Sequence, residues 1–145
     1  MTVIEHADIL ADLFGHWPDF HDAELRTVSL NAPGDGTAFL ELGIEVAEMS
    51  DEVDERGFYR DRQRCHTVLR FENVLNARLD GFRYQNVLDA LVIQEIDSTE
   101  RGKAGADWSD RQFRVTLVPI PAFCDMEFLC DSIRVLTATV IAPAI

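Results

Sequence analysis

The sequence predicts an α+β fold: a predominantly antiparallel β-sheet of about six or seven strands, with an N-terminal helix packed on or beside it. Two patterns predict this class. Apolar side chains recur at helical spacing within residues 2–14, whereas residues 38–46, 65–71, 113–117 and 133–141 alternate apolar and other side chains with a period of two. The length of 145 residues, with no linker long enough to divide it, predicts a single domain over residues 1–145.

The N-terminal helix is expected over residues 2–14. Thr2 and Glu5 have the spacing of a capping box, in which the side chain of each residue accepts a hydrogen bond from the backbone N–H of the other. Gly15 is typical of the residue that follows a helix, and Pro18 prevents simple continuation. The apolar stripe expected to pack against the sheet consists of Ile9, Leu10, Leu13 and Phe14.

The strand over residues 38–46 is the clearest in the sequence, because its apolar side chains alternate with mostly polar ones. It follows an imperfect strand from Ala23 to Leu30 and a turn-forming segment at residues 31–36, so the two strands are expected to form a hairpin. The other strands are expected at residues 65–71, 74–79, 91–96, 113–117 and 133–141, with polar loops at residues 48–64 and 98–110 and a helical turn at residues 84–90.

The charge of the chain is strongly asymmetric. The net charge is -13, and residues 1–55 hold 14 of the 26 acidic residues but only one of the 13 basic residues, Arg26. Such a surface is a poor partner for nucleic acid or for an anionic membrane, whereas it favours a basic protein partner. The alternative is that the acidity only keeps a small domain in solution. No apolar run approaches the length of a membrane span, and the N-terminus lacks the basic residues of a secretory signal, which predicts a cytoplasmic protein.

The three cysteines, Cys65, Cys124 and Cys130, lie within or beside apolar segments and form no CxxC motif. Because their number is odd and no signal peptide precedes them, they are expected to be small buried hydrophobic residues rather than a disulfide framework. The sequence contains no GxSxG, GxGxxG or HExxH motif and no phosphate-binding loop. No cofactor and no metal ion is therefore predicted.

One segment, residues 15–24, concentrates two histidines, two aromatic residues and three acidic residues between the helix and the first strand. By residue type, His21, Asp22 and Glu24 suit a metal site or acid–base catalysis, with a distant ligand such as His66. In a strand, however, Asp22 and Glu24 would lie on one face and His21 on the other. A small metal-dependent or acid–base enzyme is therefore the alternative function.

The favoured interpretation of the same segment is structural. Trp17 and Phe20 are expected to be mostly buried in the core, and His21 and Asp22 are expected to hold the irregular chain by hydrogen bonds.

A second candidate site is the acidic run from Glu41 to Glu55, which has seven acidic residues and no basic residue. In a strand, Glu41 and Glu45 lie opposite the apolar side chains, so they are expected to reach solvent. The run is either a solvated strand face and loop or a docking surface for a basic protein. The candidate docking residues are Glu41, Glu45, Glu48, Asp51, Glu52, Asp54 and Glu55.

The segment Leu13-Phe14-Gly15-His16-Trp17-Pro18-Asp19-Phe20-His21-Asp22-Ala23-Glu24 resembles the immunity protein 50 family of bacterial polymorphic toxin systems. In that family a helix ends in glycine, and Trp-Pro-x-Phe-His-Asp-Ala-Glu leads into the first strand. Weaker similarity occurs at residues 68–71, 80–82, 85–87 and 128–135, so the resemblance covers roughly residues 10–137. The shared motif residues are Trp17, Pro18, Phe20, His21, Asp22 and Glu24.

The resemblance implies a cytoplasmic, non-enzymatic antidote that binds and neutralises a cognate toxin domain. Toxin contacts are expected to vary between members, so the acidic run, and not the shared motif, is the expected contact surface, and a basic toxin is favoured. The alternatives are the enzyme described above and a general interaction or ligand-binding domain without a toxin partner.

Overall fold

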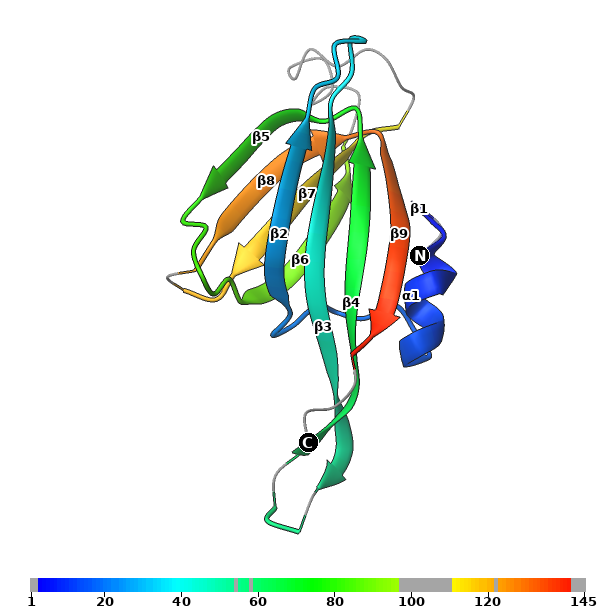
Figure 1. Ribbon diagram of the computed structural model, residues 1–145, viewed down its shortest axis with the longest axis vertical. Helices are drawn as coiled ribbons and strands as arrows, with labels where there is room; N and C mark the ends of the chain where they lie inside the picture. The colour runs from blue at the N-terminus through cyan, green and yellow to red at the C-terminus, as the bar shows by residue number, and fades with distance from the viewer. Residues whose placement is uncertain (1–2, 54, 58, 97–110, 122, 142–145) are drawn as a thin grey trace.

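The computed structural model describes residues 3–53, 55–57, 59–96, 111–121 and 123–141. Within these residues the chain forms one helix and nine largely antiparallel strands, which confirms the predicted α+β class. The strands are divided between two sheets rather than collected in one (Figure 1). The elements are β1 (Ile4–Glu5), α1 (Ala7–Phe14), β2 (Glu24–Asn31), β3 (Phe39–Val53), β4 (Tyr59–Glu72), β5 (Leu75–Asp80), β6 (Leu88–Glu95), β7 (Phe113–Pro119), β8 (Asp125–Cys130) and β9 (Ser132–Val140).

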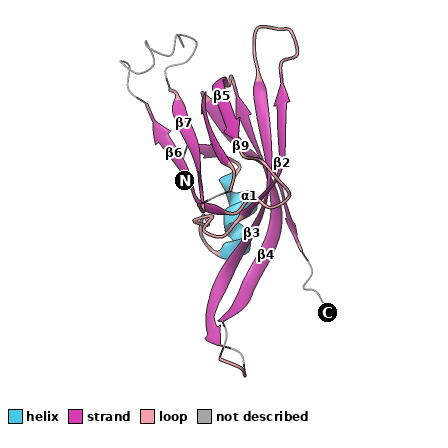
Figure 2. Ribbon diagram, turned by 90° about the vertical axis from the view of Figure 1, so that its left-hand side faces the viewer, coloured by secondary structure: helices cyan, strands magenta, loops and turns pink. Residues whose placement is uncertain are grey.

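The two sheets lie in two layers with the core between them (Figure 2). The first sheet has the strand order β1-β9-β4-β3-β2 and the second has the order β5-β8-β7-β6. The Phe71 ring of β4 meets the Phe128 ring of β8 edge-on across this interior, with 4.8 Å between the ring centroids. The alternation of residues 38–46 is confirmed, because four apolar side chains of β3 are buried in the interior: Leu40, Leu42, Ile44 and Val46.

The chain passes between the sheets at two adjacent corners. Residues 73–74 connect β4 with β5, and Asp131 alone connects β8 with β9. The Asn73 side chain donates a hydrogen bond of 2.6 Å to the Asp131 carboxylate, and the Asp131 N–H donates to the Glu72 carbonyl. Strand β8 is absent from the sequence prediction, since a one-residue corner provides no turn signal between β8 and β9.

The helix begins at Ala7, so the prediction of a helix from residue 2 is wrong. Ile4 and Glu5 instead form β1, which pairs in parallel with Ile133 and Arg134 of β9. His6, with a left-handed φ of 58°, starts the helix without a side-chain cap. Burial of Ile4 together with the pairing to β9 outweighs a capping box, which contributes only about 1 kcal/mol.

The helix packs beside β9 at one edge of the first sheet (Figure 1), and Gly15 ends it with a φ of 81°, as predicted. Its buried side chains are Ala7, Leu10 and Phe14. Ile9 was expected in the apolar stripe but is exposed, because the buried face follows the spacing of Ala7, Leu10 and Phe14 and Ile9 lies outside it.

The hairpin of β3 and β4 corrects the predicted loop at residues 48–64. β3 continues to Val53 and β4 begins at Tyr59, with Glu48 opposite Gln63 and Val53 opposite Tyr59. β2 stops pairing with β3 at Glu45, and β9 stops pairing with β4 at Cys65. Residues 48–53 and 59–63 therefore form a two-stranded arm that projects from the body of the molecule (Figure 1). We call this segment the hairpin arm.

Three further predictions concern the segments between strands. Residues 84–90 do not form the predicted helical turn: residues 84–87 belong to an irregular connection, and β6 begins at Leu88. The loop expected at residues 98–110 lies outside the described residues. The predicted hairpin around residues 31–36 is confirmed, with Leu30 opposite Leu40 across the turn.

Candidate functional site

The shared motif connects α1 with β2 and packs against the core as an irregular segment. Phe20 is 1% exposed, Pro18 is buried, and Trp17 is partly buried, with its ring centroid 5.6 Å from that of Phe20. The prediction of a mostly buried side chain is thus confirmed for Phe20, and Trp17 is partly buried and packs against the core. Phe20 and Asp22 both have left-handed backbone, with φ of 63° and 62°. Such a conformation is strained for the bulky Phe20, whereas aspartate adopts it more readily, so packing around Phe20 must hold the segment.

His21 lies at an exposed corner and has hydrogen-bonding partners on several sides. Its backbone N–H donates to the Asp19 carboxylate at 2.9 Å. Its Nδ1 atom lies 3.1 Å from the Asp89 carboxylate, and its Nε2 atom lies 3.5 Å from that of Asp22. The Asp22 N–H donates to the Leu88 carbonyl at 2.9 Å. These contacts tie the motif to the start of β6, as the structural interpretation predicts.

The same contacts raise the pKa of His21 above its ordinary value of 6.5. The hydrogen bond to the Asp89 carbonyl contributes most, followed by the negative charge of Asp22. Both ring nitrogens face oxygen acceptors, and only the imidazolium form can donate from both.

The candidate enzyme residues are distributed over different parts of the fold. Glu24 is the first residue of β2 and forms an ion pair with Arg26 at 2.9 Å. His66 lies on β4, where it is paired with Glu45 across the strands. Of the candidate residues, the structure places Asp22 beside His21, at 3.5 Å, and the second carboxylate near His21 is that of Asp89. Within the described ranges, no group of three or more His, Cys, Asp or Glu side chains is arranged to hold a metal ion.

The acidic run is divided into two parts by the structure. Glu41 and Glu45 lie on the outer face of β3, whereas Glu48 lies on the inner face, in unbroken register with the buried residues Ile44 and Val46. Each of the three acidic side chains is only about a quarter exposed, at 26%. Each of them also faces a basic side chain: Arg70 at 4.0 Å from Glu41, Arg26 at 3.0 Å from Glu45, and His16 beside Glu48.

The second part of the run belongs to the hairpin arm. Asp51 and Glu52 are residues of its β3 strand, and Glu55 is exposed at its tip. Asp54 lies outside the described residues. The sequence pattern showed the acids but not their partners, because Arg70 and His16 come from other parts of the chain.

The three cysteines are buried and free, as predicted. Burial raises the pKa of the Cys65 thiol to about 11 and that of Cys130 to about 12, and it also raises that of Cys124. A thiol with so high a pKa is protonated at neutral pH, and the thiolate is the reactive form. These side chains therefore serve as core residues.

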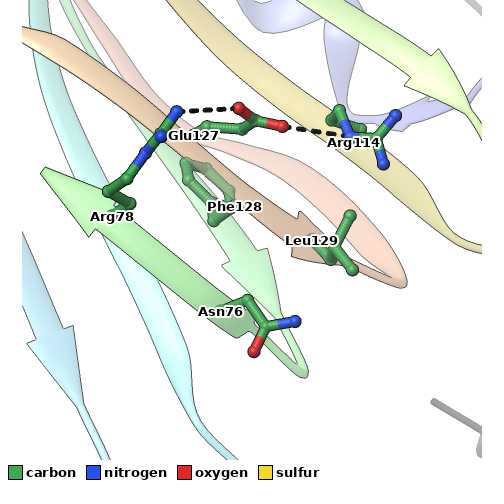
Figure 3. A pocket seen from close by; sticks show the side chains of 6 residues that line it. All are labelled: Asn76, Arg78, Arg114, Glu127, Phe128 and Leu129. Atoms are coloured by element: carbon green, nitrogen blue, oxygen red, sulfur yellow. Dashed lines mark hydrogen bonds and ion pairs between the residues drawn. The ribbon is translucent and has the colours of Figure 1, made fainter. Parts of the chain in front are cut away.

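A pocket that the sequence did not indicate lies on the second sheet (Figure 3). Its volume is about 250 Å³, and Arg78 of β5 and Arg114 of β7 lie on either side of Glu127 of β8, at 3.1 and 3.0 Å. These residues are far apart in the chain and meet only through strand pairing. Since the Glu127 carboxylate already accepts from both guanidinium groups, the arrangement is that of a structural ion-pair cluster.

Comparison with known proteins adds one positive finding. A family model described as "Immunity protein 50" matches residues 6–140. Comparison with curated proteins and with solved structures gives no match. Within the described residues, no helix has the length and apolar character needed to cross a membrane.

Proposed function

The chain belongs to the immunity protein 50 family, and is thus an immunity protein of a toxin system; from this premise we propose that it binds a cognate toxin domain and neutralises it by direct protein–protein contact. The observation that carries the proposal is the family match, which spans residues 6–140 of the 145-residue chain. The protein acts in the cytoplasm of the cell that makes the toxin, requires no cofactor, and performs no catalysis.

We place the toxin contact on the acidic run, Glu41, Glu45, Glu48, Asp51, Glu52, Asp54 and Glu55. Within the run we place the contact mainly on the distal part, because Glu41 and Glu45 already face Arg70 and Arg26 and would have to exchange these partners. The support for the distal part is the hairpin arm itself. Among the residues that the structure describes, its two strands pair only with each other, which leaves both edges of the arm for a partner in this proposal.

The proposal is tested by co-expression with the toxin domain encoded by the neighbouring upstream gene. We expect growth to be restored and a stoichiometric complex to co-purify with the toxin domain. An unrelated acidic protein of similar size is the control, because it matches the charge but lacks the fold. Rescue without a complex would indicate a chemical rather than a binding mechanism and would overturn the proposal, as would failure of both rescue and binding.

A further inference from the structure

The connection between β5 and β6, residues 81–87, presents aromatic side chains to solvent. Six large apolar side chains are exposed in the described part of the chain, and three of them lie within six residues: Leu79, Phe82 and Tyr84. Tyr84 is 86% exposed, and Phe82 is 45% exposed. Single exposed apolar residues are ordinary on a protein surface, whereas a local group of this kind is typical of an interaction site.

The backbone of this connection, which we call the aromatic loop, is held in place by Asn86. Asn86 is 2% exposed; its side chain accepts from the Arg83 N–H at 2.9 Å and donates to the carbonyls of Arg83 and Leu25 at 2.8 and 3.2 Å. The Leu25 N–H donates to the Asn86 carbonyl. An aromatic side chain on a fixed backbone loses little conformational entropy when it binds, so the loop is organised in advance for a partner.

Arg83 adds a third side-chain type that is common at the centres of interfaces. Its guanidinium lies 5.2 Å from the centroid of the Phe123 ring and 5.8 Å from that of Tyr84. Tyrosine and arginine are enriched among the interface residues that contribute most of the binding energy, whereas leucine is under-represented there. The composition of the aromatic loop therefore resembles the centre of an interface.

Carboxylates surround the aromatic loop on two sides. Asp80 and Asp125 are both exposed and directly opposite each other in β5 and β8. On the other side, Asp22 and Asp89 flank His21, and the Asp22 N–H is bonded to Leu88 where β6 begins. A matching partner surface has an apolar depression with basic residues around it.

The aromatic loop also lies at the end of the molecule from which the hairpin arm projects (Figure 1). Glu24 forms a bridge with Val87 of the loop and is paired with Glu45 of β3, just before the arm begins. One partner can therefore contact the arm and the loop together.

From these observations we infer that Phe82 and Tyr84 are the apolar anchor of the toxin interface, and that they insert into an apolar, base-rimmed site on the toxin domain. This inference rests on the proposed function. It assigns different roles to the two surfaces: the acidic run on the hairpin arm attracts and orients the toxin, and the aromatic loop supplies most of the affinity.

Calorimetric titration with the toxin domain of the neighbouring gene, inactivated by a substitution in its own active site, tests the inference. Tyr84→Ala and Phe82→Ala are each expected to raise Kd at least 30-fold, while Tyr84→Phe changes it less than threefold. Leu30→Ala is the matched control, because Leu30 is 56% exposed but lies at the opposite end of β2. Its Kd should stay within twofold of the wild-type value.

The possible results are distinguishable. If the wild-type protein binds the toxin and both alanine variants bind within threefold of it, the anchor is wrong while the proposed function stands. If the wild-type protein neither binds nor rescues, the proposed function itself fails. Should sedimentation show a dimer that Tyr84→Ala dissociates, a second copy of this chain occupies the loop and the toxin assignment is overturned. Because Tyr84 is so exposed, its alanine variant folds even if Phe82→Ala does not.

Discussion

Phe20 combines a fully buried ring with a backbone conformation that a bulky residue rarely adopts. A left-handed φ costs roughly 1–2 kcal/mol, whereas burying the ring contributes about 1.5–3 kcal/mol. Burial thus offsets the strain, and the bond from Asp22 to Leu88 keeps the next turn in place. The motif that the family shares acts as the connection between helix and sheet.

Replacement of Trp17 tests this structural role. Trp17→Ala is expected to lower the free energy of unfolding by about 1–3 kcal/mol, less than the roughly 3–5 kcal/mol of a fully buried aromatic residue, because the ring is only partly buried. Thermal unfolding measures the loss, and protection from the toxin should fall only with the amount of folded protein. A fully stable Trp17→Ala variant that fails to protect would show that the motif contacts the toxin.

His21 makes the stability of this corner depend on pH. Its pKa is raised in the folded protein by the Asp89 carbonyl and by the charge of Asp22. A raised folded pKa gives a stabilisation that is fully present below the ordinary value of 6.5 and is lost as the pH rises through the folded pKa. The melting temperature of His21→Gln should therefore fall below that of the wild type at pH 5.5, and the gap should narrow by pH 8.5.

A matched variant isolates the cause. In Asp89→Asn the side-chain partner of His21 loses its charge, while Asp22 and the backbone carbonyl of residue 89 remain. The melting temperature of this variant is therefore expected to depend less on pH than that of the wild type. If the difference in melting temperature between the wild type and His21→Gln stays constant from pH 5.5 to 8.5, His21 is not the cause of the pH dependence.

At the scale of elements, the hairpin arm is a two-stranded extension that lies beyond the pairing of β2 and β9 with the sheet. Two strands without a third strand or a packed face are marginally stable in water. The arm continues the pairing of β3 and β4 from the core pair Leu40–Phe71 outward to Val53–Tyr59, with a register shift after Glu48 and another after Met49. It can therefore adjust to a partner while its base remains fixed.

Charge reversal on the arm tests whether it attracts the toxin. Asp51→Lys with Glu52→Lys should change the free energy of unfolding by no more than about 0.5 kcal/mol, as surface substitutions usually do. Association with the toxin domain should become slower and less dependent on salt, since charge pairs across an interface couple by about 1.5–7 kcal/mol. Stopped-flow association at several salt concentrations measures both effects.

The control for charge reversal is Asp8→Lys with Asp12→Lys, which makes the same change in net charge on exposed residues of α1. If the two double variants lose the same fraction of the association rate, only the overall charge of the protein matters. Wild-type association in the arm variant would remove the acidic run from the binding surface.

At the scale of the whole molecule, the two sheets are joined by the paired corners at Asn73 and Asp131. Asn73 has a left-handed φ of 52° and donates its side-chain N–H to the Asp131 carboxylate. Burial raises the pKa of Asp131, so the corner is partly removed from water and the hydrogen bond compensates a desolvated carboxyl group.

Asn73→Ala is expected to destabilise the protein by about 1–3 kcal/mol, because it leaves the Asp131 carboxylate without this donor and places alanine at a positive φ. Asn76→Ala is the control: Asn76 also has a positive φ, 55°, but is exposed on β5. The difference between the two variants in chemical denaturation reports the bond between the corners. Equal destabilisation would show that backbone strain accounts for the whole effect.

The sequence predicted most of the residues of the candidate site, but not the contacts that their side chains make. The motif and the acidic run were visible in the sequence because their residues are contiguous. The interaction partners were not visible. His21 pairs with Asp89 of β6, and Glu41 pairs with Arg70 of β4, and each partner lies far away in the sequence. The aromatic loop was also missed: Phe82 and Tyr84 read as ordinary apolar residues until their exposure was known.

The sequence by itself determined the class of the fold, because alternation along β3, β4, β7 and β9 is a local consequence of strands with one buried face. It also determined the helix end at Gly15 and the burial of the cysteines. Only the tertiary structure decided that the strands divide into two sheets, that residues 4–5 form a strand, and that the polar residues 48–64 extend a hairpin. Those features depend on pairing between distant segments, whose free energy comes from contacts that no local pattern encodes.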